Sequence, residues 1–114
     1  MARVLLVEDE ASLREIVAEA LADWGHELAV AADGVEAMRH LAERTFDVVV
    51  SDISMPGGVS GIDLAEHMRL AGIPGKVILV SGHARAQLPQ IPEQAIFLPK
   101  PYRIHQLFEL VGKP

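Results

Sequence analysis

Short apolar runs without alternation recur along the chain, and three of them are rich in β-branched residues. They cover residues 4–7, 48–50 and 77–80. A strand that is buried on both faces carries no polar residue at every second position, so these runs predict central strands of a parallel sheet. Two weaker runs, at 27–31 and 95–98, suit the outer strands of the same sheet. The pattern therefore predicts five strands.

Apolar residues at helical spacing lie between most of these runs. They predict helices over 13–24, 35–42, 62–68 and 104–111, with Gly25 as a C-terminal cap of the first and an end near Gly72 and Pro74 for the third. Because strands and helices alternate, we expect an α/β fold with right-handed crossovers and helices on both faces of the sheet. The length suits one domain, residues 1–114.

The fourth crossover departs from this regularity. Residues 83–94 contain Pro89 and Pro92, and a proline inside a helix removes a hydrogen bond and clashes with the preceding turn. A fourth helix at this place is expected to be short or missing.

Composition narrows the functional classes. The formal net charge is -6 and the charges are scattered, so the chain has no basic stripe and no direct contact with nucleic acid is expected. The sequence has no cysteine, which excludes disulfides and thiolate metal sites. No apolar run approaches the length of a membrane span or the pattern of a signal peptide. We expect no membrane association and a cytoplasmic location.

Polar side chains follow four of the predicted strands. Glu8 and Asp9 follow the first strand, Asp52 the third, Ser81 the fourth and Lys100 the fifth. Because the carboxyl ends of parallel strands meet at one edge of a sheet, where ligands bind, these side chains are expected to converge on one crevice.

Three carboxylates at this edge predict a metal ion. Glu8, Asp9 and Asp52 would repel one another unless a cation lay between them. A set of oxygen donors favours Mg²⁺, and Mn²⁺ could substitute. The alternative is that the acidic run 8–10 only caps the following helix. A capping role suits Asp52 less well, because it is followed by a Pro-Gly-Gly loop and not directly by a helix.

Two further residues have a functional and a simpler interpretation. Lys100 lies between two prolines that restrict its backbone, which suits a lysine that binds phosphate, although a lysine near a strand end is commonly a solvated charge. Ser81 precedes Gly82 and could be only a turn residue. Gly82 would leave the site unobstructed.

Four short motifs occur in order on these strands, namely Glu8-Asp9, Asp-Ile-Ser-Met-Pro at 52–56, Ser81-Gly82 and Lys100-Pro101. In this combination the chain resembles, over essentially its whole length, the receiver domains of two-component response regulators. The resemblance implies a flavodoxin-like, doubly wound sheet with strand order 2-1-3-4-5. It fits both stand-alone receivers and C-terminal receivers of hybrid histidine kinases, and the sequence does not decide between them.

The resemblance also implies roles for the residues at the strand ends. Asp52 would accept a phosphoryl group from a phosphohistidine on a sensor histidine kinase or a histidine phosphotransfer protein. Lys100 and Ser81 would contact the phosphoryl oxygens. The domain would catalyse only this transfer and its own dephosphorylation. Mg²⁺ would be held by Asp9, by Asp52, by the backbone carbonyl of Ser54 and, through water, by Glu8.

A switch between two states is implied as well. The phosphoryl group would draw Ser81 inward, and Phe97 would turn from exposed to buried, although most strand phenylalanines are simply core residues. Ser54, Gly82 and His83 would flank the phosphoryl group, and His83 could equally be a surface residue after a turn. The four other histidines are expected to be exposed: His26, His40, His67 and His105.

Two departures from the common receiver pattern concern the output. The glycine-rich segment 57–61 is expected to be mobile. The proline-broken segment makes output through a regular fourth helix doubtful, which directs attention to Phe97, residues 99–102 and the last helix, or to the first helix. The downstream effector is unknown, and a monomer or weak dimer is expected.

Two rival functions remain. One is a degenerate receiver that binds a partner protein constitutively. The other is a metal-dependent phosphohydrolase with Asp52 as nucleophile, similar to haloacid-dehalogenase-like enzymes. The second would be favoured by an acid two positions after the nucleophile, and here that position is Ser54.

Overall fold

A five-stranded parallel sheet forms the centre of the computed structural model, which describes residues 2–83 and 87–112. The strand order is β2-β1-β3-β4-β5, as the resemblance to receiver domains implies. The strands are β1 (Arg3–Val7), β2 (Glu27–Ala31), β3 (Val48–Asp52), β4 (Lys76–Ser81) and β5 (Ile96–Pro99). The two weaker apolar runs are the edge strands β2 and β5, because each has only one neighbouring strand.

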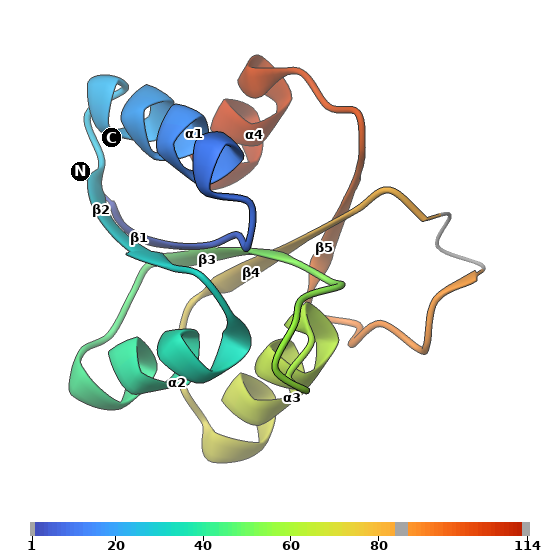
Figure 1. Cartoon of the computed structure of the whole chain (residues 1–114). Helices are drawn as coiled ribbons and strands as arrows, with labels where there is room; N and C mark the ends of the chain where they lie inside the picture. Colours follow the sequence, from blue (N-terminus) through green and yellow to red (C-terminus); the bar gives the residue numbers. More distant parts are fainter. Residues whose placement is uncertain (1, 84–86, 113–114) are drawn as a thin grey trace.

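Four helices within the described residues cover the two faces of this sheet. They are α1 (Ala11–Asp23), α2 (Gly34–Glu43), α3 (Gly61–Ala71) and α4 (Ile104–Val111). Figure 1 shows α1 and α4 on one face and α2 and α3 on the other. The fold is therefore the doubly wound arrangement expected from the alternation of strands and helices.

The absence of alternation in the central strands follows from this double cover. Val4 and Leu6 of β1 pack on the α1–α4 side, while Leu5 and Val7 pack on the α2–α3 side. All four side chains are buried. Successive side chains of a strand point to opposite faces, so a strand covered on both sides needs an apolar residue at every position.

The connection between β4 and β5 contains no α-helix in its described part, residues 82–83 and 87–95. Ile91 and Ala95 are buried there and belong to the core cluster on the α2–α3 side. The described part of this crossover agrees with the expectation of a short or missing helix, and residues 84–86 lie outside the described residues. The fourth helix in chain order, α4, follows β5. Two apolar side chains of the connection cover part of the face that a helix would otherwise cover.

The last residue of segment 57–61, predicted to be mobile, begins α3. Ser60 and Asp63 form a reciprocal capping box at the start of α3, with Asp63 N donating to Ser60 Oγ and Ser60 N to Asp63 Oδ2, both at 3.0 Å. Gly61 is the first residue of this helix and is buried. The cap and the close packing of Gly61 on β3 restrain the backbone at this end, and the mobility of the segment stays a prediction.

Of the four histidines expected to be exposed, His105 is exposed, His40 and His67 are half-buried, and His26 differs most from expectation. His26 is buried rather than exposed, with only 5% of its surface accessible. Its Nδ1 accepts a hydrogen bond from the backbone N–H of Ala2 at 3.2 Å, so its Nε2 carries the proton and donates to the carbonyl oxygen of Gly112 at 3.0 Å. The ring thereby joins the residue before β1 to the residue after α4.

The first and last helices are tied to each other at the same end of the sheet. The ring of Trp24, the residue that follows α1, stacks on Phe108 of α4 with ring centroids 4.8 Å apart.

The described helices include none that is both long and apolar enough to cross a bilayer.

Candidate functional site

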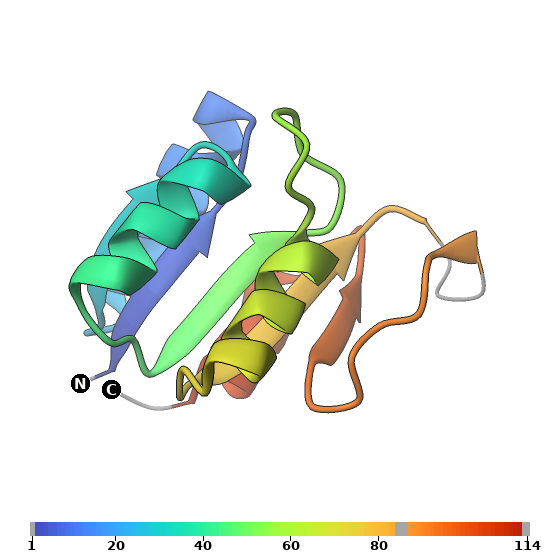
Figure 2. The ribbon, with the colours of Figure 1, turned by 90° about the horizontal axis from the view of Figure 1, so that it is seen from below.

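The predicted polar residues converge on the carboxyl edge of the sheet. Asp52 and Ser81 are the last residues of β3 and β4, rather than the residues that follow them, because the strand pairing extends to Asp52–Val80 and Ser81–Pro99. Figure 2 shows the sheet from below, with β1, β3 and β4 running side by side toward this edge. A pocket of about 290 Å³ lies there, lined by Glu8, Asp9, Glu10, Asp52, Ser54, Val80, Ser81, Gly82, His83 and Lys100. Phe97 is the one predicted site residue that does not line this pocket.

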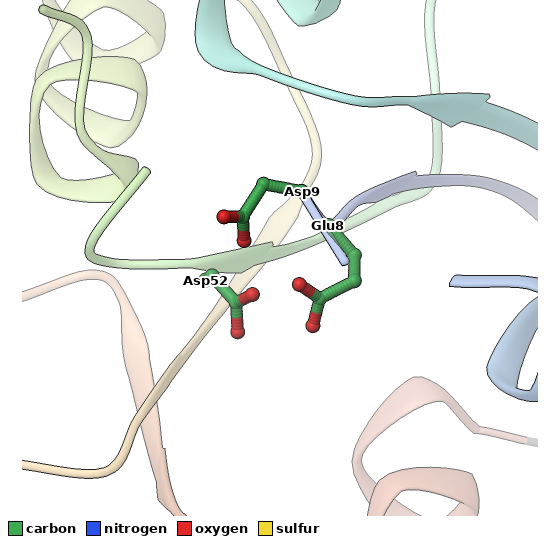
Figure 3. A group of neighbouring side chains, drawn as sticks. All are labelled: Glu8, Asp9 and Asp52. Carbon is green, nitrogen blue, oxygen red and sulfur yellow. The ribbon is translucent and has the colours of Figure 1, made fainter. Parts of the chain in front are cut away.

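An acidic cluster forms one wall of the pocket. One carboxylate oxygen from each of Glu8, Asp9 and Asp52 lies within 4.8 Å of the others. Figure 3 shows the three side chains directed toward one another, two from the segment after β1 and one from the end of β3. Glu8 and Asp52 are buried and Asp9 is exposed. These oxygens could hold a metal ion, and a donor set made only of carboxylates fits a hard cation such as Mg²⁺.

Lys100 supplies the positive charge that faces this cluster. Its Nζ lies 3.0 Å from Asp52 Oδ1 and 3.8 Å from Glu8 Oε1. Burial acts to lower the pKa of Lys100, but the hydrogen bond and charge of Asp52, with a further contribution from Glu8, outweigh it and raise the pKa above its usual value. The ammonium is therefore charged at neutral pH. The backbone N–H of Lys100 also donates to the carbonyl of Ser81 at 2.7 Å, which ties the end of β5 to β4.

The pKa of Glu8 is raised although Lys100 lies nearby. Burial raises the pKa of its carboxyl group, and the neighbouring Asp52 adds to the rise. A carboxyl group with a raised pKa in the folded state binds its proton more tightly there than in the unfolded chain. Ionisation of Glu8 therefore destabilises the folded state once the pH exceeds the ordinary pKa of a glutamate.

Replacing Glu8 by glutamine is expected to stabilise the metal-free protein at pH 7. The charged carboxylate costs about 1.4 kcal/mol of folding free energy for each unit by which its pKa is raised. The gain should shrink as the pH falls through the folded-state pKa and vanish below about 4.5, where the wild-type carboxyl group is protonated in both states. Urea unfolding at several pH values measures it. Two results would contradict this account: a Glu8→Gln variant less stable than wild type at pH 7, or a gain in unfolding free energy that is the same at all pH values.

Ser81 ends β4, and its side chain contacts the turn that follows. Its hydroxyl is buried and accepts a hydrogen bond from the backbone N–H of His83 at 3.0 Å. This geometry fits the turn interpretation, and it leaves the hydroxyl proton available to a ligand in the pocket. Ser54, Gly82 and His83 are exposed at the rim. Phe97 is half-buried and packs against the core on the α2–α3 side.

Three residues that the sequence did not single out lie directly behind the acidic cluster. Arg14 Nη1 donates to the carbonyl oxygen of Glu8 at 2.8 Å. Ser51 is fully buried, and its Oγ donates to the carbonyl oxygen of Asp52 at 2.9 Å. Gly61 packs so closely on β3 that an added Cβ would lie 2.3 Å from that same oxygen of Asp52.

Each of these residues left some signal in the sequence. Ser51 is a polar residue inside an apolar strand. Gly61 follows the Ser of a Ser-x-x-Asp capping pattern. Arg14 is a basic residue in the first turn of a helix, where acidic residues are normally favoured.

The fold and this edge together define the class of protein. The chain belongs to the response regulator receiver domain family, whose model matches residues 4–112. It is thus a receiver domain of the kind used in two-component signalling, a class of generally non-catalytic signalling modules.

The proteins similar to this chain include both response regulators and sensor kinases. It is 36% identical to the response regulator protein FleR of Pseudomonas aeruginosa over 98% of this chain and 24% of that protein. It is 40% identical to the sensor kinase CckA of Brucella abortus over 93% of this chain and 12% of that protein. The chain thus spans a quarter or less of these relatives. The structure of TrrA from Thermotoga maritima, in complex with Mg²⁺-BeF, matches with a TM-score of 0.86 and 31% identity, over 97% of this chain and 96% of that one.

Proposed function

We propose that this receiver is a phosphorylation-dependent switch in which Asp52 is the phosphoacceptor. The observation that carries the proposal is the position of Asp52. It is a buried carboxylate at the end of a central strand, and Lys100 lies 3.0 Å from one of its oxygens inside a pocket open to solvent. Asp52 would carry the phosphoryl group. The ammonium of Lys100 could neutralise its negative charge, and the acidic neighbours could hold a cation that does the same.

The chemistry needed from the chain itself is limited. An oxygen of Asp52 attacks the phosphorus of a phosphohistidine on a sensor histidine kinase or histidine phosphotransfer protein. The new phosphorus–oxygen bond forms as the phosphorus–nitrogen bond of the donor breaks, and the histidine leaves. Lys100 balances negative charge on the equatorial oxygens, and the hydroxyl of Ser81 donates to one of them. Ser54, Gly82 and His83 flank the bound group.

The acidic cluster would hold Mg²⁺ through Asp9, Asp52 and the backbone carbonyl of Ser54, with Glu8 contributing through water. The all-oxygen donor set supports this assignment, as does the raised pKa of Glu8, since a cation would relieve the repulsion that contributes to it. When bound, the ion supplies further neutralisation of phosphoryl charge. The similar protein TrrA has been crystallised with Mg²⁺-BeF, which agrees with this proposal.

The signal would leave the site through Ser81 and Phe97. A phosphoryl group adds up to about two negative charges and three strong acceptors, so it can draw the Ser81 hydroxyl away from its turn. Phe97 lies on the neighbouring strand and is only half-buried, which leaves it room to become more buried. A protein partner that binds the β5 edge in one state only would then detect the change.

Phosphorylation by a small donor tests the central assignment. Incubation with Mg²⁺ and acetyl phosphate is expected to add one phosphoryl group to the wild-type chain, read as intact mass. Asp52→Asn should add none, because an amide cannot form the acyl phosphate. Glu93→Gln, which changes an exposed acid in the β4–β5 connection, is the matched control and should be labelled like wild type.

The remaining outcomes separate the rival functions. An unlabelled wild type would indicate a degenerate receiver that acts only by constitutive binding. Equal labelling of wild type and Asp52→Asn would place the phosphoacceptor elsewhere. Steady turnover of an unrelated phosphate ester that is lost in Asp52→Asn would favour the phosphohydrolase.

A further inference from the structure

Arg14 occupies a position that helix stability does not explain. It lies in the first turn of α1, where the partial positive charge of the helix dipole disfavours a basic side chain. Its guanidinium turns back to the segment before the helix, and Nη1 donates to the carbonyl oxygen of Glu8 at 2.8 Å. A hydrogen bond from a charged donor at this length is among the stronger ones in proteins. Contact with Glu8 therefore accounts for its orientation.

The backbone and side chain of Glu8 have two other anchors. The N–H of Glu8 donates to the carbonyl of Ala31 at 3.0 Å, and its Oε2 accepts the N–H of Glu10 at 3.1 Å. The carbonyl of Glu8 lies in the same rigid peptide plane as the N–H of Asp9. A rotation of this plane would therefore re-aim both acidic side chains. Within the described residues, the contact that restrains this plane from the carbonyl side comes from Arg14.

We infer that Arg14 is a positioning residue for the acidic cluster: it holds the Glu8–Asp9 peptide in the orientation that binds Mg²⁺. The inference rests on the proposed function in one respect, namely that Mg²⁺ binds at this cluster. Residues behind metal ligands orient them in this way in many sites, and their loss commonly weakens metal binding by about 10- to 100-fold.

The sign of the effect distinguishes positioning from simple electrostatics. A guanidinium bound to the backbone of Glu8 also repels a cation at the acidic cluster, so removing a side chain that acted only through its charge would tighten Mg²⁺ binding. Removing a side chain that positions the ligands would weaken it. A purely structural residue would lower the unfolding temperature and leave the affinity of the folded protein unchanged.

Isothermal titration of the whole chain with Mg²⁺ measures the difference. Arg14→Met keeps much of the apolar stem but has no donor, and we expect its dissociation constant to rise about tenfold. Arg14→Lys keeps the charge and one donor group, and should restore part of the affinity. Arg39→Met removes an exposed arginine from α2 and is the matched control, expected to stay within about twofold of wild type. Labelling of Arg14→Met by acetyl phosphate should recover when Mg²⁺ is saturating.

Two outcomes would overturn the inference: unchanged or tighter Mg²⁺ binding by folded Arg14→Met, or labelling that stays low at saturating Mg²⁺. If Arg14→Met does not fold, as judged by circular dichroism, Arg14→Gln is the deciding variant, with the same expected weakening. A wild-type chain that does not bind Mg²⁺ would instead overturn the metal site of the proposed function.

Discussion

Lys100→Met is expected to slow the phosphorylation of Asp52 by about 100-fold or more at saturating Mg²⁺. The variant loses the ammonium that lies 3.0 Å from Asp52 Oδ1, and with it the charge that faces the transferring group. Removing one such electrostatic contact from a transition state commonly costs about 10²–10³ in rate. The time course of labelling by acetyl phosphate, read as intact mass, gives the rate directly.

A lysine at the other end of the neighbouring strand provides the control for Lys100→Met. Lys76 begins β4, and its Nζ donates to the carbonyl of Leu110 in α4, away from the pocket. Lys76→Met removes the same charge from the protein and should leave the rate of labelling unchanged. Mg²⁺ should bind Lys100→Met at least as tightly as wild type, because a repelling cation is gone. A wild-type rate in Lys100→Met would remove Lys100 from the proposed chemistry.

Gly61→Ala is expected to destabilise the fold by about 1–3 kcal/mol and to reduce labelling of Asp52 in the protein that remains folded. The new Cβ would lie 2.3 Å from the carbonyl oxygen of Asp52 and 3.1 Å from the Cα of Ile53. Both neighbours are backbone atoms, so relief requires α3 to move away from the end of β3. Urea unfolding and the labelling time course measure the two effects.

Gly82 offers a matched substitution at the same edge of the sheet. A Cβ at this position would meet nothing within 4 Å, so Gly82→Ala should leave the free energy of unfolding within about 0.5 kcal/mol of wild type. If Gly61→Ala were equally harmless, the close approach of α3 to β3 would not constrain the phosphoacceptor.

The strands and the site edge could be predicted from the sequence because both depend on local patterns. The central strands are buried on both faces, so their apolar runs mark them clearly, and the polar residue after each run then locates the edge where ligands bind. Pro89 and Pro92 likewise predicted that the fourth crossover lacks a regular helix. In each case the signal lay within a few residues of the feature it predicted.

Features that depend on the path of the folded backbone could not be predicted in this way. Arg14 turns back to the carbonyl of Glu8 and Gly61 packs on the end of β3, and no apolar or capping pattern in the sequence identifies either contact. His26 became a buried residue because Ala2 and Gly112 meet there, and Gly112 is separated from it by 86 positions. The proposed movement of Ser81 and Phe97 concerns a second state, so it stays a prediction.

The bridge made by His26 has a practical consequence for work with this protein. Ala2 and Gly112 meet at the amino ends of the strands, whereas Asp52 ends β3 at the opposite edge of the sheet. A fluorophore, an affinity handle or a surface tether joined beyond either residue would attach to the side of the molecule away from the acidic pocket. Immobilised receivers should therefore present that pocket to a phosphodonor in solution, whichever end is used for attachment.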